Sequence, residues 1–209
     1  MYYKLHSYGL TVFFLFCILL SAPLFAQRLE IHGIKDLSND KTANKAWGVG
    51  GAVLLDQWVK KTTFGVYFDW TTYRPKNKPI NPRYDRMSAG ILVFYSINIS
   101  KKFSLQCGAD INYTNLKHSY IHSYQTIDTV SEKPITLQQT GDFIGIGAYI
   151  GANYEFSSRF GVKINVIPTY LISVGSKSSS SAVAPEYAKG IWMFPLKLGL
   201  TYKIFNSKE

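Results

Sequence analysis

The sequence predicts an all-β fold, namely an eight-stranded antiparallel up-and-down transmembrane β-barrel. Three observations predict it: many segments alternate apolar and polar residues, the connections between them alternate long and short, and an export signal precedes them. A strand turns successive side chains to opposite faces, so each such segment has one apolar and one polar face. Strands of outer-membrane barrels are apolar toward lipid and polar toward the lumen, so we expect this chain in the outer membrane of a Gram-negative bacterium.

Residues 1–26 form a predicted signal peptide, and residues 27–209 form a single predicted barrel domain. Lys4 supplies the positive end, an apolar stretch follows over 9–20, and cleavage is expected before Gln27. The apolar stretch is shorter than the roughly 20 residues that a membrane helix needs. Because no later segment has the length and hydrophobicity of such a helix, the mature chain can cross a membrane only as a closed barrel.

Eight segments of the mature chain have the period of a strand. Their expected ranges are 28–35, 46–58, 62–74, 86–99, 103–115, 140–156, 160–175 and 191–205. The fifth is clear, because every second residue from Phe103 to Tyr113 is apolar. The first is the weakest, since only Leu29, Ile31 and Gly33 alternate with polar residues.

The connections between these segments carry independent information. Those after the first, third, fifth and seventh segments are long, at about 10, 11, 24 and 15 residues. Those after the second, fourth and sixth are tight, near 59–61, 100–102 and 157–159. Outer-membrane barrels have short periplasmic turns and long external loops, so this alternation favours a membrane barrel over a soluble one.

Aromatic residues are expected in two rows on the lipid-facing side, where amphipathic rings meet the headgroup regions. The upper row, near the long loops, is Trp47, Trp70, Tyr113, Tyr170 and Trp192, and the lower row, near the short turns, is Phe64, Phe103, Phe156, Phe160 and Tyr202. The alternative is that aromatic residues are simply common in strands.

The opposite face of the strands carries charges, which we expect to form an ion-pair network inside the barrel. Its predicted members are Glu30, Asp56, Asp69, Asp110 and Glu155 with Arg28, Arg86, Lys163, Lys197 and Lys203. An eight-stranded barrel is just wide enough for side chains to fill its interior, so no wide channel is expected. A soluble barrel with an apolar cavity would bury these charges and expose the apolar faces to water.

The loop that begins at Arg74 is the most distinctive external segment. Residues 74–86 hold five bases, one acid and three prolines. We expect Arg74, Lys76, Lys78 and Arg83 to contact lipopolysaccharide phosphates through charge-assisted hydrogen bonds, and a merely solvated basic loop is the alternative. The positive charge does not favour nucleic acid, because no recognition motif is present.

A second external feature is the segment around His118 and His122, where a His-Ser-Tyr triplet occurs twice. The fifth and sixth strands are expected to continue here as an external hairpin over 115–140, whose edge could add a strand from a protein partner. Two histidines this close could bind a metal, but no third ligand lies nearby in the sequence, so we expect neither metal nor other cofactor.

Two prolines, Pro168 and Pro195, interrupt the seventh and eighth segments at similar heights. Proline lacks the amide hydrogen that a strand ladder needs. The two hypotheses are a bend or bulge at each proline and a weak seam that admits a lipid tail sideways.

With strands, loops and signal placed, the mature chain resembles the small outer-membrane β-barrel (porin-like) families of Gram-negative bacteria. Its Ala26-Gln27 cleavage site and loop proportions look most like the Bacteroidota-type barrels that include PorT. The resemblance implies an outer-membrane location and a barrel fold, and it says little about activity.

Catalytic motifs such as G-x-S-x-G and H-E-x-x-H are absent from the sequence. We therefore predict a non-enzymatic barrel that acts as an anchor, an adhesin or a component of a secretion or envelope complex, through its external loops or periplasmic face. The alternatives are a lipid A-modifying enzyme, either a deacylase or an acyltransferase, and a narrow solute or ion channel. Deacylase barrels carry a His-x-Ser pair, whereas Tyr stands two residues after both His118 and His122.

Overall fold

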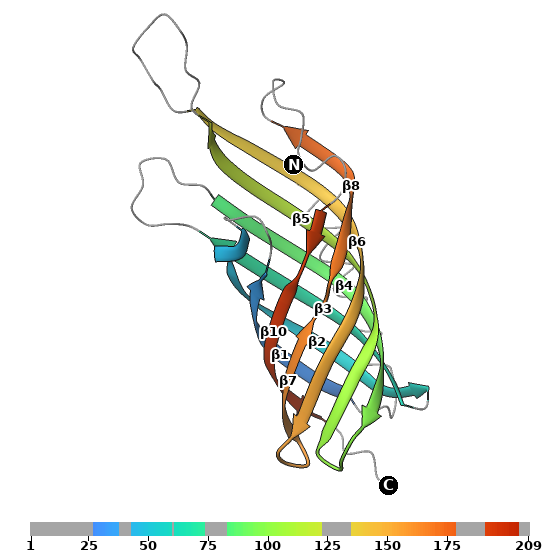
Figure 1. Cartoon of the computed structure of the whole chain (residues 1–209). Helices are drawn as coiled ribbons and strands as arrows, with labels where there is room; N and C mark the ends of the chain where they lie inside the picture. Colours follow the sequence, from blue (N-terminus) through green and yellow to red (C-terminus); the bar gives the residue numbers. More distant parts are fainter. Residues whose placement is uncertain are drawn as a thin grey trace, which may run out of the picture.

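A computed structural model describes residues 27–37, 43–59, 61–73, 83–122, 135–178 and 191–204, which form an antiparallel barrel (Figure 1). The first six strands are β1 (Gln27–Asp36), β2 (Trp47–Val59), β3 (Thr62–Tyr73), β4 (Arg83–Asn98), β5 (Phe103–His122) and β6 (Ile135–Glu155). The remaining strands are β7 (Phe160–Val166), β8 (Thr169–Ser178), β9 (Ile191–Met193) and β10 (Pro195–Lys203), and a short 3-10 helix, η1 (Ala43–Lys45), precedes β2. No helix in the described part of the chain is long and apolar enough to cross a membrane.

The barrel wall closes where β1 pairs with β10. From β1 to β6 each strand pairs antiparallel with the next, and β6 then pairs with both β7 and β8. In turn, β10 pairs with β7 and β9 pairs with β8, so β7 with β8 and β9 with β10 each make one crossing of the wall. The wall therefore has eight antiparallel crossings, and the predicted eight-stranded up-and-down barrel is confirmed.

Burial alternates along each strand in the way that the sequence pattern predicts. On β3, Tyr67 and Asp69 are 7% and 2% exposed, whereas the outward Phe68 and Trp70 are 52% and 42% exposed. The same holds around the wall, where the outward side chains are mostly aliphatic or aromatic. A one-residue slip of any strand would turn its apolar face inward, so the apolar outer band fixes the register.

Two of the short turns share one design. In the first, the hydroxyl oxygen of Ser100 accepts hydrogen bonds from the backbone N–H groups of Lys102 and Phe103, at 3.3 and 3.1 Å. In the second, Ser157 accepts from Arg159 and Phe160 at 3.3 and 2.9 Å. The remaining short turn, between β2 and β3, places Lys61 at a φ of 65°, a left-handed conformation that a tight turn requires.

The hairpin of β5 and β6 is much longer than a membrane crossing needs. The two strands have 20 and 21 residues and pair from Phe103–Tyr154 up to His122–Ile135. About 9–11 residues suffice for a tilted barrel strand to cross a bilayer. The two strands of the expected hairpin are therefore present over 115–122 and 135–140, while 123–134 lie outside the described residues, and the predicted bounds of the fifth and sixth strands at 115 and 140 were too short.

Flanking strands cover most of this hairpin. The ladder of β4 against β5 reaches Ser119, and the ladder of β8 against β6 reaches Gln139. Within the described part of the chain, only 120–122 of β5 and 135–138 of β6 extend past these neighbours. The unpaired edges of β5 and β6 among the described residues are thereby confined to the tip of the hairpin.

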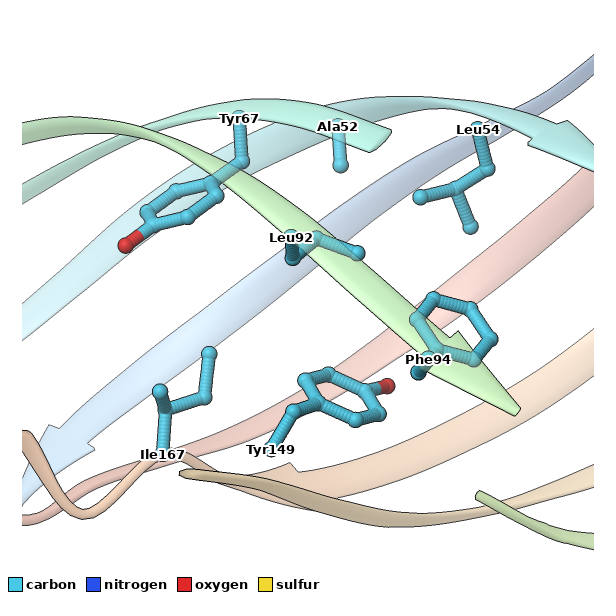
Figure 2. Packing of buried hydrophobic residues seen from close by; sticks show 7 residues of the cluster. All are labelled: Ala52, Leu54, Tyr67, Leu92, Phe94, Tyr149 and Ile167. Carbon is cyan, nitrogen blue, oxygen red and sulfur yellow. The ribbon is translucent and has the colours of Figure 1, made fainter. Parts of the chain in front are cut away.

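Two apolar clusters fill part of the lumen. The upper cluster, toward the long loops at the top of Figure 1, consists of Ala46, Tyr84, Leu116, Phe143, Leu171 and Met193. The lower cluster, shown in Figure 2, consists of Ala52, Leu54, Tyr67, Leu92, Phe94, Tyr149 and Ile167. In it the rings of Phe94 and Tyr149 stack with centroids 4.7 Å apart. The expectation of an ion-paired lumen was thus incomplete, because apolar side chains occupy the space that the charged groups leave.

Candidate functional site

The inward face of β1 carries four buried ionisable side chains, more than any other described strand. Arg28, Glu30, His32 and Asp36 lie on that face, and each is at most 8% exposed. Alternation along a strand turns residues of even number to the same side, so one strand presents all four to the lumen. The strand with the weakest sequence signal is therefore the one around which the ionic network is built.

The centre of the network is a continuous chain of five ionisable side chains. Lys163 Nζ lies 2.7 Å from Glu30 Oε2, and Glu30 Oε1 lies 3.0 Å from His32 Nδ1. The other ring nitrogen, Nε2, lies 2.8 Å from Asp69 Oδ1, and Asp69 Oδ2 lies 2.6 Å from Lys197 Nζ. The chain joins β7, β1, β3 and β10 across the lumen, and His32, which stands between the two carboxylates, was absent from the sequence prediction.

Below this chain, toward the short turns, Arg28 joins two acids. Its guanidinium lies 2.8 Å from Asp56 and 3.7 Å from Glu155. Lys203 Nζ contacts the other oxygen of Glu155 at 2.7 Å. The side chains of Glu155 and Lys203 are both 26% exposed, so this end of the network reaches the mouth of the barrel.

Above the central chain, Arg86 pairs with Asp36 at 3.0 Å, and its Nε donates to the Thr71 hydroxyl at 3.1 Å. Asp36 was also absent from the sequence prediction, because the first predicted strand ended one residue before it, at 35. Its side chain is fully buried, so its pairing with Arg86 leaves neither charge isolated in the lumen.

One predicted member of the network does not have the partner that we expected. Asp110 makes no ion pair with a described residue and instead accepts a 2.5 Å hydrogen bond from the Asn112 amide. Asn112 in turn accepts from Thr114 at 2.9 Å, and Thr114 lies 2.8 Å from Ser88. The inward face of β5 thus carries a ladder of side-chain hydrogen bonds that begins at the Asp110 carboxyl, and the prediction that Asp110 belongs to an ion-pair network was wrong.

The two central lysines connect the ionic chain to the lower apolar cluster. Lys163 Nζ lies 4.8 Å from the ring centroid of Phe94 and 5.2 Å from that of Tyr149, and Lys197 Nζ lies 4.0 Å from the Tyr67 centroid. A cation over an aromatic face is stabilised by the ring quadrupole. Each ammonium therefore contacts a carboxylate of the ionic chain and an aromatic ring of the lower apolar cluster. These contacts connect the ionic part of the lumen to its apolar part.

A small recess remains between the two apolar clusters. Asp69, Arg86 and Lys197 form part of its lining, and Ile167 and Leu171 form another part. Its volume of about 10 Å³ is room for a single water molecule. Binding pockets for small molecules usually span about 300–1,000 Å³, so this recess is far smaller than such a pocket.

The prolines interrupt the ladders beside this recess. Ala148 N–H donates to the Pro168 carbonyl at 3.0 Å and Ile167 N–H donates to the Pro195 carbonyl at 3.2 Å, but neither proline can return a bond. The Thr169 hydroxyl, however, donates to the Ile167 carbonyl at 2.9 Å. A side chain thus supplies the bond that Pro195 cannot, and the interruption is a local irregularity in a closed wall.

Near the long loops, polar side chains replace apolar ones at several outward positions of the strands. We call three cross-strand pairs in this part of the wall the rim pairs: Lys35–Trp47, Thr72–Asp85 and Asn115–Asp142. In the first, Lys35 Nζ lies 4.8 Å over the Trp47 ring. In the others, Thr72 and Asn115 donate to the aspartates at 2.6 and 2.7 Å.

The predicted aromatic rows lie at the two ends of the apolar band. In the upper row Trp47, Tyr113 and Trp192 are 66%, 50% and 57% exposed, and in the lower row Phe156 and Phe160 are 50% and 49% exposed. Neighbouring rings pack together within each row, with centroids 5.2 Å apart for Tyr170 and Trp192 and 5.0 Å apart for Phe160 and Tyr202.

The external basic loop lies mostly outside the described residues, which include neither Arg74, Lys76 and Lys78 nor the side chain of Arg83. Tyr73 pairs with Tyr84, so the loop leaves and returns to the wall beside a rim pair. The predicted signal peptide, 1–26, also lies outside the described residues. The described part of the chain holds no group of three or more His, Cys, Asp or Glu side chains that could bind a metal ion.

Comparison with known proteins gives a fold and no closer relative. No family model and no curated protein matches the sequence. Among solved structures, a major outer membrane protein from Thermus thermophilus matches with a TM-score of 0.55, 10% identity, and coverage of 86% of this chain and 100% of that chain. Neisserial surface protein A (NspA) matches with a TM-score of 0.51, 15% identity, and coverage of 86% and 97%. The outer membrane protease OmpT from Escherichia coli is also similar, at a TM-score of 0.37, 9% identity, and coverage of 88% and 98%.

The closed eight-crossing wall, its apolar outer band and these matches define the chain as a small β-barrel of the bacterial outer membrane. The predicted location is therefore confirmed. At 10% and 15% identity the two similar barrels share the fold alone, so activity has to be argued from the residues of this chain.

Proposed function

We propose that this protein is a non-enzymatic outer-membrane barrel that presents an external binding surface, as an adhesin or as a component of an envelope complex. The observation that carries this proposal is the contrast between a filled lumen and a wall that continues above the rim pairs. We define this external wall as residues 83–85 of β4, 114–122 of β5, 135–143 of β6 and 173–178 of β8.

A filled lumen makes the barrel a rigid support. The five-membered ionic chain that includes Glu30 and Lys163 is buried and spans the lumen, and the lower apolar cluster packs against it. Opening a path for solute would separate buried ion pairs, and breaking one such pair costs about 3–5 kcal/mol. The interior therefore holds the strands in place, and recognition falls to the surfaces outside the membrane.

The external wall provides such a surface on one side of the barrel. Nine residues of β5, 114–122, continue past the upper aromatic row, which corresponds to about 30 Å of strand. Because β4 and β8 flank the hairpin, this wall is a four-stranded sheet rather than a lone ribbon. We propose that a protein partner contacts the tip of the 115–140 hairpin or the outer face of this wall.

The basic loop next to the wall supports a second contact. Arg74, Lys76, Lys78 and Arg83 leave from the rim between β3 and β4, where the headgroups of the outer leaflet begin. We propose that these side chains bind lipopolysaccharide phosphates and fix the depth of the barrel. The resemblance to Bacteroidota barrels that include PorT fits a role in a secretion or envelope complex, and that closer kinship remains a prediction.

The test of surface recognition replaces residues 123–134 by a short Asn-Gly turn and compares the proteins that cross-link to the variant and to the wild type in native envelopes. We expect the variant to insert and to lose specific partners. Identical cross-linked sets would contradict a binding role for the tip.

Three further measurements separate the alternatives. The variant R74Q/K76Q/K78Q should bind lipopolysaccharide vesicles more weakly than the wild type does.

The protein should produce no discrete conductance in planar bilayers, since a channel would produce current steps. Mass spectrometry of lipid A should be unchanged by expression, whereas loss or gain of an acyl chain would identify an enzyme.

A further inference from the structure

We propose that the short-turn end of the barrel is a rigid basic surface that binds the phosphates of anionic phospholipids in the adjacent leaflet. The described residues of the three short turns, 61, 99–102 and 156–159, include four bases and no acid. The bases are Lys61, Lys101, Lys102 and Arg159, and all four are exposed. This inference concerns the opposite end from the proposed recognition surface and is independent of it.

The backbone of each turn is fixed by the neighbouring strand. The carbonyl of Lys61 accepts from Ser96 N–H at 3.0 Å, and that of Lys102 accepts from Glu155 N–H at 2.8 Å. The carbonyl of Arg159 accepts from Lys203 N–H at 2.8 Å in the same way. In all three turns, therefore, the backbone of the last base is hydrogen-bonded to the next crossing of the wall, which fixes the point from which its side chain extends.

A serine then sets the position of the base in two of the turns. Ser100 accepts from the N–H groups of Lys102 and Phe103, and Ser157 accepts from those of Arg159 and Phe160. Each base is thus placed immediately before an aromatic residue of the lower row. Aromatic rings of barrels collect at the headgroup level, so the adjacent ammonium and guanidinium groups lie at the level of lipid phosphates.

The nearby acids do not neutralise this surface. Asp56 and Glu155 are the acids at this end of the described strands, and both point inward, where they pair with Arg28 and Lys203. The exposed turn bases therefore have no acidic partner among the described residues. Charge complementarity and headgroup depth favour a phospholipid phosphate as the anion, because a soluble polymer would not require the bases to sit beside the aromatic row.

The test uses the full-length mature barrel, labelled with ¹⁵N, in nanodiscs of phosphatidylcholine into which phosphatidylglycerol is titrated. We expect saturable shifts of the amide signals of Lys102, Phe103, Arg159 and Phe160 that weaken with added salt. In K102Q/R159Q the preference for phosphatidylglycerol should fall at least about fivefold, since each base near an anionic surface contributes about that factor. The matched control K45Q/K117Q removes two exposed bases from the other end and should leave these shifts unchanged.

Two further measurements test whether charge alone is required and whether the phosphate must belong to a lipid. K102R/R159K should retain the preference, and glycerol phosphate without acyl chains should produce no comparable shift. If K102Q/R159Q does not insert, as judged by its migration on unheated gels, K102Q and R159Q alone should each show a partial loss. Equal shifts at both ends of the barrel, or shifts that persist in the neutralised variants, would overturn the proposal.

Discussion

Below the rim pairs and above them, the same strands show opposite arrangements of polarity. Below, Ile111 and Ile146 point outward and are 61% and 57% exposed, while charged groups point inward. Above, polar residues such as Lys117 and Asp142 take outward positions, and the inward Leu116 and Phe143 are 3% and 1% exposed. The pairing of β5 with β6 continues through this change without a register shift. The change therefore lies in which residues occupy the inward and outward positions and not in how the two strands pair.

The surroundings of each region explain the inversion. Hydrocarbon imposes no penalty on apolar side chains, and the lower region can place its charges only in the lumen, where they pair. Water surrounds the upper region, so burial of apolar groups in its interior stabilises it as in a soluble protein. One barrel thus combines a membrane region, whose lumen holds paired charges beside an apolar cluster, with a water-facing extension whose described core is apolar.

The largest expected effect comes from the ionic core of the lower region. Glu30→Gln leaves Lys163 and His32 facing each other without their shared carboxylate, so we expect about 3–5 kcal/mol loss in the free energy of unfolding. Denaturant unfolding in detergent, followed by tryptophan fluorescence, measures it. The double variant E30Q/K163M should be less destabilised than E30Q, and equal losses would contradict coupling between the pair.

The apolar core of the upper region should respond locally. Phe143→Ala removes a ring that is 1% exposed from the upper cluster, and such truncations cost about 3–5 kcal/mol. Because the membrane region has its own core, we expect the external wall to become sensitive to protease while the barrel still migrates as folded on unheated gels. Loss of the whole barrel would show that the two regions fold as one unit.

An outward charge should distinguish the two regions directly. Ile111→Arg places a charge in the hydrocarbon band, where it costs about 2–4 kcal/mol, whereas Asn115→Arg, two outward positions higher, should cost about 0–1 kcal/mol. Both residues lie on the same face of β5, so the pair of variants is matched for strand and side. Refolding into vesicles gives the two free energies, and similar values would move the membrane boundary above Asn115.

The inversion also explains which strand bounds could be predicted from the sequence. The alternation of apolar residues is continuous up to Tyr113, and then Leu116 takes the opposite phase. A strand predicted from one continuous alternation of apolar and polar residues therefore ended near 115. For the same reason the start of β4 was placed at 86 instead of 83, because Tyr84 is also an apolar residue on the inward side. The barrel and its crossings were predictable because they depend on the period alone.

The partners inside the lumen were less accessible to sequence reasoning. Glu30 and Lys163 are separated by 133 residues, and their contact depends on closure of β1 against β10 and of β10 against β7. The alternation of polar and apolar residues showed which charged side chains face the lumen, but it did not show which of them lie opposite each other. Asp110 was therefore assigned to ion pairs, although it accepts a hydrogen bond from the Asn112 amide. His32 could have been recognised, since it shares the face of Arg28 and Glu30 on β1.

The smallest expected effect concerns the junction between the two regions, where Pro168 and Pro195 interrupt neighbouring ladders. Thr169→Val removes the hydroxyl that donates to the Ile167 carbonyl, and an unsatisfied buried acceptor costs about 1–3 kcal/mol. Thr169→Ser keeps the hydroxyl and should be nearly neutral. Pro195→Ala restores an N–H group opposite Ile167, so T169V should cost less in the P195A background than alone. If T169V costs the same in both backgrounds, the hydroxyl does not replace the missing ladder bond, and the junction is held instead by the apolar contacts of Ile167 and Leu171 on its two sides.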